Sequence, residues 1–144
     1  MIKTSTIALI MACTFFSCKS GKIADKSNKP LHEKVIVEPD FSKQGKNTRM
    51  QIQEVKLISD KTIEISFSYS GGCKEHSFSL YTSGALIKTL PPKIHLFLVN
   101  HQQEDACREL ITAKIQFDIS NALPSNTKKT ILIFNDVFEY ALEI

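Results

Sequence analysis

The chain has 144 residues, 42% of them hydrophobic, with no Trp and a formal net charge of +3 at pH 7. A charge this small, without a basic stripe interleaved with aromatic residues, argues against a nucleic-acid-binding protein. The charge is uneven, because residues 19–49 contain eight basic and four acidic side chains, whereas residues 50–144 contain nine basic and eleven acidic ones. This contrast indicates a basic N-terminal segment followed by a folded domain.

Residues 1–17 have the features of a secretory signal peptide. Lys3 supplies a positive charge, and the apolar run that follows it, residues 6–16, is too short to span a bilayer as a stable helix. The run ends in Ser17 and Cys18, and a small residue directly before a cysteine resembles the lipobox of bacterial lipoproteins. The resemblance implies cleavage before Cys18 and lipidation of Cys18.

Cys13 also follows a small residue, but cleavage there would leave an unusually short leader, so we predict Cys18 as the lipid site. An ordinary secretory signal with a free cysteine is the alternative. Several acyl chains hold a protein stably on a membrane, and lipoprotein processing supplies two or three. Residues 18–49 are therefore predicted to be a lipidated cysteine and a flexible basic tether, in an oxidising space outside the cytoplasm. Within it, residues 34–38 could add a short edge strand.

From residue 50 onward, apolar and polar residues alternate as they do in half-buried β-strands. Ile63, Ile65 and Phe67, for example, fall on one face of a strand. Seven such segments follow one another: 53–59, 62–69, 76–81, 93–100, 110–119, 129–134 and 137–144. Asn135 and Asp136 predict a tight hairpin between the last two. The pattern predicts an all-β domain over residues 50–144, a small antiparallel immunoglobulin-like β-sandwich of about seven strands.

Two cysteines lie in connections that fall at the same end of this sandwich if consecutive strands run up and down. Gly71 and Gly72 precede Cys73 in one connection, and the other runs from His101 to Cys107. In an oxidising compartment a Cys73–Cys107 disulfide is the expected outcome. Closing a ring of roughly 35 residues predicts about 3.8 kcal/mol of stabilisation. The two glycines would allow the tight reversal that aims Cys73 at the other loop.

The same loops suggest a metal site as the alternative. Cys73, His76, His101 and Cys107 supply two thiolates and two imidazoles, a set that tetrahedral Zn²⁺ accepts. That arrangement would make the protein a periplasmic metal-binding protein. The irregular spacing and the oxidising compartment favour the disulfide, with His76 on a strand flank and His101 in solvent, so no cofactor is predicted.

A catalytic reading has less support in the sequence. A Cys–His nucleophile pair would need Cys73 to remain a free thiol, and three nearby acidic residues would raise the pKa of that thiol: Glu75, Glu104 and Asp105. The chain contains no Gly-x-Ser-x-Gly elbow and no phosphate-binding loop. The prediction is therefore a protein that is not an enzyme.

Residues 63–144 resemble the C-terminal domain of NigD-like lipoproteins of the Bacteroidetes cell envelope. The matching positions are Gly71, Gly72, Lys74, His76, Leu80, His101, Asp105, Phe117, Asp118 and Ile119. The resemblance implies a β-sandwich on a lipoprotein anchor. In that family an OB-fold domain usually precedes the sandwich, and residues 19–49 are too few for one, so the immunity role proposed for the family is not carried over.

These observations predict a membrane-anchored, non-enzymatic lipoprotein that binds an envelope protein or a glycan. Loops on a rigid sandwich often carry binding, and the candidate contact residues are Gly71, Gly72, Lys74, Glu75, His76, His101 and Asp105. Residues 19–22 lack the acidic cluster associated with surface export of Bacteroidetes lipoproteins, which favours the periplasmic side of the outer membrane. Nothing in the sequence predicts an oligomeric state.

Overall fold

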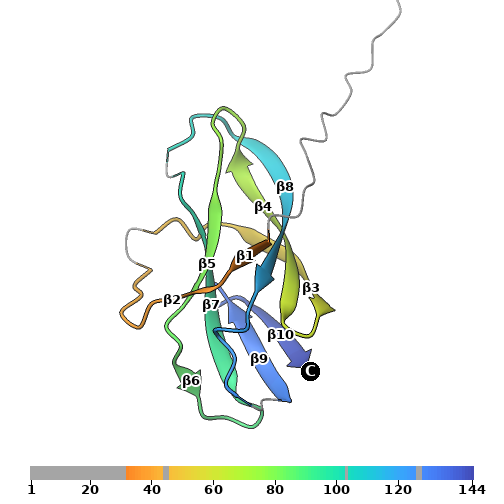
Figure 1. Cartoon of the computed structure of the whole chain (residues 1–144). Helices are drawn as coiled ribbons and strands as arrows, with labels where there is room; N and C mark the ends of the chain where they lie inside the picture. The colour runs from red at the N-terminus through yellow and green to blue at the C-terminus, as the bar shows by residue number, and fades with distance from the viewer. Residues whose placement is uncertain (1–31, 44–45, 103, 126–127) are drawn as a thin grey trace, which may run out of the picture.

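The protein is described by a computed structural model, in which residues 32–43, 46–102, 104–125 and 128–144 are placed. The predicted signal peptide, Cys18, and residues 19–31 and 44–45 of the predicted tether lie outside these described residues. Among the described residues there is no helix that could cross a membrane. The described elements are all β-strands, arranged as a sandwich of two sheets (Figure 1).

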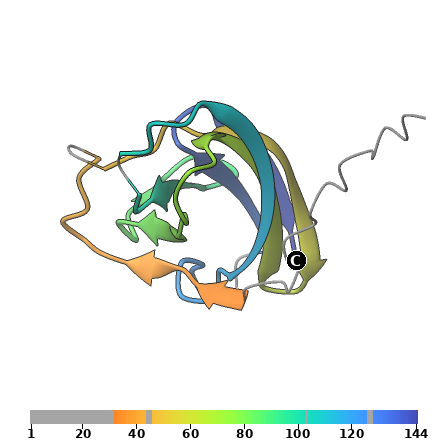
Figure 2. The ribbon, with the colours of Figure 1, turned by 90° about the horizontal axis from the view of Figure 1, so that it is seen from above.

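The first sheet has four strands, in the order β1-β8-β4-β3: β1 (His32–Lys34), β8 (Glu109–Asp118), β4 (Thr62–Gly71) and β3 (Gln51–Ser59). The second sheet has the order β10-β9-β7-β5-β2: β10 (Phe138–Glu143), β9 (Lys129–Phe134), β7 (Lys93–Asn100), β5 (Phe78–Thr82) and β2 (Ile36–Val37). A short strand, β6 (Leu86–Ile87), pairs with β7. Seen from above, the two sheets curve around a shared interior (Figure 2).

The all-β sandwich predicted from the sequence is confirmed, and the seven predicted segments correspond to β3, β4, β5, β7, β8, β9 and β10. The predicted hairpin also forms, with φ of +50° at Asn135 and +62° at Asp136. The pairing is not purely antiparallel, because β1–β8, β2–β5 and β7–β9 are parallel pairs. Between β7 and β9 the chain crosses to the other sheet along β8, so both strands run the same way.

The core fills the space between the sheets. Ile63, Ile65 and Phe67, the alternating residues of β4, are fully buried. The same is true of large side chains from both sheets: Leu80, Ile94, Leu96, Leu98, Phe117, Ile119, Leu132, Phe134 and Leu142. Alternation in the sequence therefore identified the core-facing positions correctly.

One N-terminal segment joins the two sheets. β1 pairs with β8, and β2, after a single intervening residue, pairs with β5 in the opposite sheet. That residue, Val35, is only 2% exposed, and its N–H donates to the carbonyl of Asp118 at 3.0 Å. In Figure 2, β1 and β2 follow one another end to end, and the chain passes there from one sheet to the other. The edge strand suggested for residues 34–38 is confirmed in part, because the chain forms two short edge strands there, one in each sheet. The sandwich therefore begins at residue 32 instead of residue 50.

The chain then crosses the outer face of the second sheet as a strap, defined here as residues 38–43 and 46–49. The Phe41 ring stacks on Tyr81 and Phe97, with centroid distances of 5.2 and 5.0 Å. The Lys46 ammonium lies 5.0 Å from the centroid of the Tyr81 ring. Phe97 and Val99, which point away from the main core, are therefore buried. The strap explains why both faces of β7 are apolar, and it packs a part of the chain that was expected to be a flexible tether.

Candidate functional site

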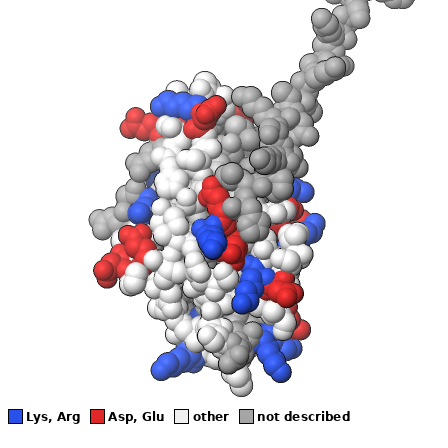
Figure 3. Space-filling model, viewed as in Figure 1, with Lys and Arg blue, Asp and Glu red and all other residues white. Residues whose placement is uncertain are grey.

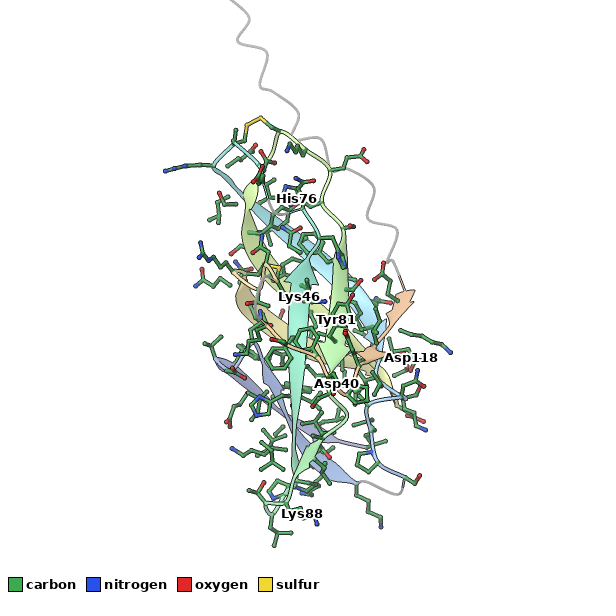
Figure 4. The ribbon with its side chains drawn as sticks, turned by 90° about the vertical axis from the view of Figure 1, so that its left-hand side faces the viewer. Asp40, Lys46, His76, Tyr81, Lys88 and Asp118 are labelled. Carbon is green, nitrogen blue, oxygen red and sulfur yellow. A yellow bond between two sulfur atoms is a disulfide. The ribbon has the colours of Figure 1, made fainter. Side chains whose placement is uncertain are left out.

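Two loops meet at one end of the sandwich, and a disulfide joins them. The β4–β5 loop carries Cys73 and the β7–β8 loop carries Cys107, and their Cα atoms lie 5.5 Å apart. Figure 4 shows the disulfide at the upper end of the molecule. The predicted disulfide and the predicted placement of both loops at one end are confirmed. We call this region, residues 71–77 with the described residues of 101–108, the loop end.

The carboxylate of Asp105 holds the two loops together. Its Oδ2 accepts the backbone N–H groups of Gly72, Cys73 and Lys74, each at 3.1 Å. Its Oδ1 accepts the N–H of Cys107 at 2.9 Å. The Asp105 side chain is only 3% exposed, so these hydrogen bonds replace water around a buried charge.

His76 extends this network into the sandwich. Its Nε2 lies 3.0 Å from Asp105 Oδ2, and its Nδ1 lies 2.8 Å from the Nδ2 of Asn100. This pattern fits the tautomer in which Nε2–H donates to Asp105 and Nδ1 accepts from the amide. The His76 side chain is only 2% exposed, and its ring centroid lies 4.7 Å from that of Tyr69. Both ring nitrogens are therefore used inside the protein.

These contacts set the electrostatics of the loop end. The N–H of Cys107, the His76 ring and the N–H groups of Lys74 and Cys73 lower the pKa of Asp105 well below its usual value, although burial acts in the opposite direction. Burial, and then the charge of Asp105, raises the pKa of Tyr69. Asp105 is therefore a fixed negative charge, and Tyr69 a neutral phenol beside it.

The two glycines have separate roles in this geometry. A Cβ on Gly71 would lie 2.5 Å from His76 Nε2, so only glycine lets the imidazole reach Asp105. Gly72 has a φ of +120°, which side-chain-bearing residues rarely adopt. Its positive φ matches the predicted tight reversal, whereas the close approach at Gly71 was not predicted.

The structure gives each of the four residues of the alternative metal site another partner. The two sulfur atoms are bonded to each other, and His76 is held by Asp105 and Asn100. His101 is exposed, and its Nε2 lies 3.0 Å from the hydroxyl of Ser79. The Asp105 carboxylate also lies close to the two sulfurs, but its oxygens already accept the N–H groups described above. The set is therefore used for cross-linking and hydrogen bonding.

Two members of the network were not predicted. Asn100 is 3% exposed at the end of the apolar strand β7, where its Oδ1 also accepts the N–H of Gln102 at 3.0 Å. A polar amide that ends a run of buried apolar residues was the available signal. Tyr69 was assigned to the core face of β4, which is correct but gave no indication of its contact with His76.

The surface of the loop end mixes charges of both signs. Exposed charged residues on and beside the loops are Lys74, Glu75, Glu104, Arg108 and Glu109. The Lys74 ammonium donates to the carbonyl of Glu104. Leu110, at the start of β8, is 73% exposed. In Figure 3 blue and red side chains lie together at this upper end of the molecule.

Comparison with known proteins shows likeness in fold. The chain matches no protein-family model and no curated protein. Among solved structures, a protein of unknown function DUF1344 from Bacteroides vulgatus aligns with a TM-score of 0.54 and 20% identity, over 80% of this chain and 56% of that chain. A candidate lipoprotein from Bacteroides fragilis aligns with a TM-score of 0.54 and 14% identity, over 79% of this chain and 70% of that one.

A NigD-like immunity protein from Bacteroides caccae is also similar, with a TM-score of 0.49 and 11% identity, over 78% of this chain and 59% of that chain. The chain thus spans little more than half the length of two of these three proteins. The resemblance to Bacteroidetes-type lipoproteins noted in the sequence is supported by the Bacteroides fragilis structure at the level of the fold.

Proposed function

We propose that the protein is a membrane-anchored lipoprotein of the cell envelope that acts as a non-enzymatic binding module, with the loop end as its contact surface. The observation that carries the proposal is the way the loops are held. One disulfide and one buried carboxylate fix both of them on a rigid sandwich. A surface that is already ordered binds without the entropy cost of ordering its loops.

The use of polar groups at the loop end supports binding over catalysis. His76 and Asp105 are buried, and their polar atoms are taken up by each other, by Asn100 and by backbone N–H groups. Neither is placed to exchange a proton with a substrate. Cys73 and Cys107 are joined as a disulfide and supply no thiolate.

The exposed groups favour a protein partner over a glycan. Lys74 and Arg108 lie among three glutamates, and the exposed Leu110 adds an apolar side chain beside them. Apolar contacts surrounded by charged and polar groups are typical of protein interfaces. A lipid anchor would confine the module to partners near the membrane and raise their effective concentration.

The anchor is tested by growing producing bacteria with an alkyne-bearing palmitate. We expect the protein to incorporate the label and to sediment with membranes. Cys18→Ser should abolish both, whereas the matched variant Cys13→Ser should be labelled like the wild type. A labelled Cys18→Ser protein would contradict the assigned lipid site. For the proposed location on the periplasmic side of the outer membrane, external protease should leave the protein intact in whole cells.

The contact surface is tested by photo-crosslinking in cells. A photoreactive amino acid is placed at Glu75 or at Arg108, on the loop end, and for comparison at Lys56 or at Lys114 on the first sheet. We expect a discrete protein adduct from the first pair of positions only. Adducts of equal yield at all four positions, or at the comparison positions alone, would show that the loop end is not the contact surface.

A further inference from the structure

The opposite end of the sandwich exposes apolar side chains. The β6–β7 hairpin forms this end, with Leu86 and Ile87 in β6 38% and 40% exposed. Leu90, between the two strands, is 99% exposed, the most exposed of the large apolar side chains described. A single exposed leucine is ordinary, but this hairpin exposes three large apolar side chains within five residues.

Lysines lie in and next to this hairpin, and so does the C-terminal residue Ile144, whose N–H donates to the carbonyl of Lys128 at 3.0 Å. Lys88 and Lys128 are exposed and have no carboxylate partner among the described residues. The other two lysines nearby are neutralised: Lys93 pairs with Glu139 at 3.1 Å, and Lys129 with Glu143 at 2.7 Å. Figure 3 shows blue side chains on both sides of the lower end of the molecule. We call Leu86, Ile87, Lys88, Leu90 and Lys128 the tip.

The hairpin holds Leu90 outward. The Thr89 hydroxyl donates to the carbonyl of Pro91 at 2.7 Å, and the Thr89 N–H donates to the carbonyl of Ile87 at 2.9 Å. The carbonyl of Pro92 accepts the N–H of Ile131 at 2.9 Å, which ties the hairpin to β9 beside Lys128. The apolar side chain thus projects from a fixed loop, and no part of the described chain covers it.

We propose that the tip binds the surface of a membrane that contains anionic lipids. Leu86, Ile87 and Leu90 would enter the interfacial layer, and Lys88 and Lys128 would lie against lipid phosphates. Apolar side chains combined with lysines are the chemistry of proteins that rest on anionic bilayers. A protein partner fits less well, because a stable protein interface takes about 20–30 residues from each side and the tip consists of five.

The proposed anchor at Cys18 strengthens this contact but is not needed for it. Thirteen residues separate Cys18 from His32, and they reach at most about 45 Å when fully extended. A tether of that length keeps the tip close to the bilayer, so a weak contact is enough. Figure 4 places Lys88 and the disulfide at opposite ends of the molecule, so a tip resting on the membrane would direct the loop end away from it.

The test uses a chain that begins at residue 18 and carries Cys18→Ser, which keeps every described strand and has no lipid. Because the protein contains no Trp, Leu90→Trp introduces a single fluorescent reporter. With vesicles of phosphatidylglycerol and phosphatidylcholine we expect a blue shift and quenching by brominated lipid. Leu110→Trp, the matched control on the loop end, should show neither. Pure phosphatidylcholine vesicles should give a much smaller shift.

Charge is tested by vesicle co-sedimentation. Removing two lysines at a surface of this kind weakens partitioning about 30-fold, so Lys88→Ala with Lys128→Ala should lose most of its binding to anionic vesicles. Lys56→Ala with Lys114→Ala should bind normally.

Equal loss of vesicle binding in both pairs of variants, or no fluorescence shift for Leu90→Trp, would overturn the proposal. The Leu90→Trp fluorescence could also shift to the blue without vesicles, by an amount that grows with protein concentration. That result would overturn the proposal as well, because the tip would then bind a second copy of the chain. Palmitate labelling at Cys18 is measured in a separate experiment, so the proposed lipid anchor and the proposed membrane contact of the tip can fail independently.

Discussion

Asp105 carries a negative charge where water hardly reaches it. Burial alone would favour the neutral acid. Four backbone N–H groups and the His76 ring reverse that preference and lower the pKa of the carboxyl group below its ordinary value of 3.8. Because the folded-state pKa is the lower one, the stabilisation from Asp105 is complete above the ordinary value. It is lost as the pH falls from there through the folded-state pKa.

Asp105→Asn should therefore remove an acid-dependent part of the stability. An asparagine at this position turns an NH₂ group toward N–H donors, so the variant should be less stable than the wild type at pH 7. Between pH 5 and pH 2 its free energy of unfolding should fall less steeply than that of the wild type. Urea unfolding at several pH values measures both effects.

Asp40→Asn, an exposed turn residue, is the matched control and should follow the wild-type curve. If the free energy of unfolding of Asp105→Asn fell with pH as steeply as that of the wild type, the Asp105 carboxylate would not be responsible for the loss of stability in acid.

Sequence reasoning located these residues but not their contacts. Loop parity placed Cys73 and the loop from His101 to Cys107, which contains Asp105, at one end, and this was correct. Asp105 was taken as a charge that would act on a thiol, whereas it points inward and caps a loop. Alternation describes strands, and it gives no direction for side chains in loops, which is why Asn100 was also missed.

At the scale of elements, the short segment from β1 to β2 contributes more to the stability of the sandwich than its length suggests. The three residues of β1 pair with the first sheet and the two residues of β2 with the second, and Val35 is buried in the core between them. The apolar pattern of residues 34–38 predicted one edge strand. It did not reveal that Val35 separates two pairings, because the change of sheet depends on partners that are distant in sequence. The parallel pairing of β7 with β9 was missed for the same reason.

Val35→Ala should lower the free energy of unfolding by about 1.5–2.5 kcal/mol, since it removes buried methyl groups and leaves a cavity. Val37→Ala is the matched control. Val37 is 42% exposed, and the loss there should stay within about 0.5 kcal/mol. Chemical denaturation of both variants makes the comparison. Equal losses would mean that the crossing point is not part of the core.

At the scale of the whole molecule, the seven long strands, the single core and the disulfide were all predictable. Each depends on local periodicity or on the oxidising compartment. The placement of the loop end and the tip at opposite ends was not predictable, because it arises only when β6 and the two cysteine-bearing loops take their positions in the folded sandwich.

The disulfide should supply a large share of the stability of so small a domain. Its ring of roughly 35 residues predicts about 3.8 kcal/mol from chain entropy. Reduction, or Cys73→Ser with Cys107→Ser, should lower Tm by on the order of 10–20 °C. Thermal unfolding followed by circular dichroism measures the change, with Cys18→Ser as the background in every sample. A Tm that did not respond to reductant would mean that hydrogen bonding by Asp105 alone holds the loop end.

The segment from β1 to β2 has a further consequence, for the order in which the chain folds. His32 pairs with Gln116 and Ile36 with Tyr81, so this segment must wait for strands far along the chain. In pulse-labelled hydrogen exchange during refolding, the Val35 amide should gain protection after the amides of β4, and simultaneous protection would contradict this order. If the lipid is attached at Cys18, a newly exported molecule is thus fastened to its membrane first, and the end that is fastened is the last to fold.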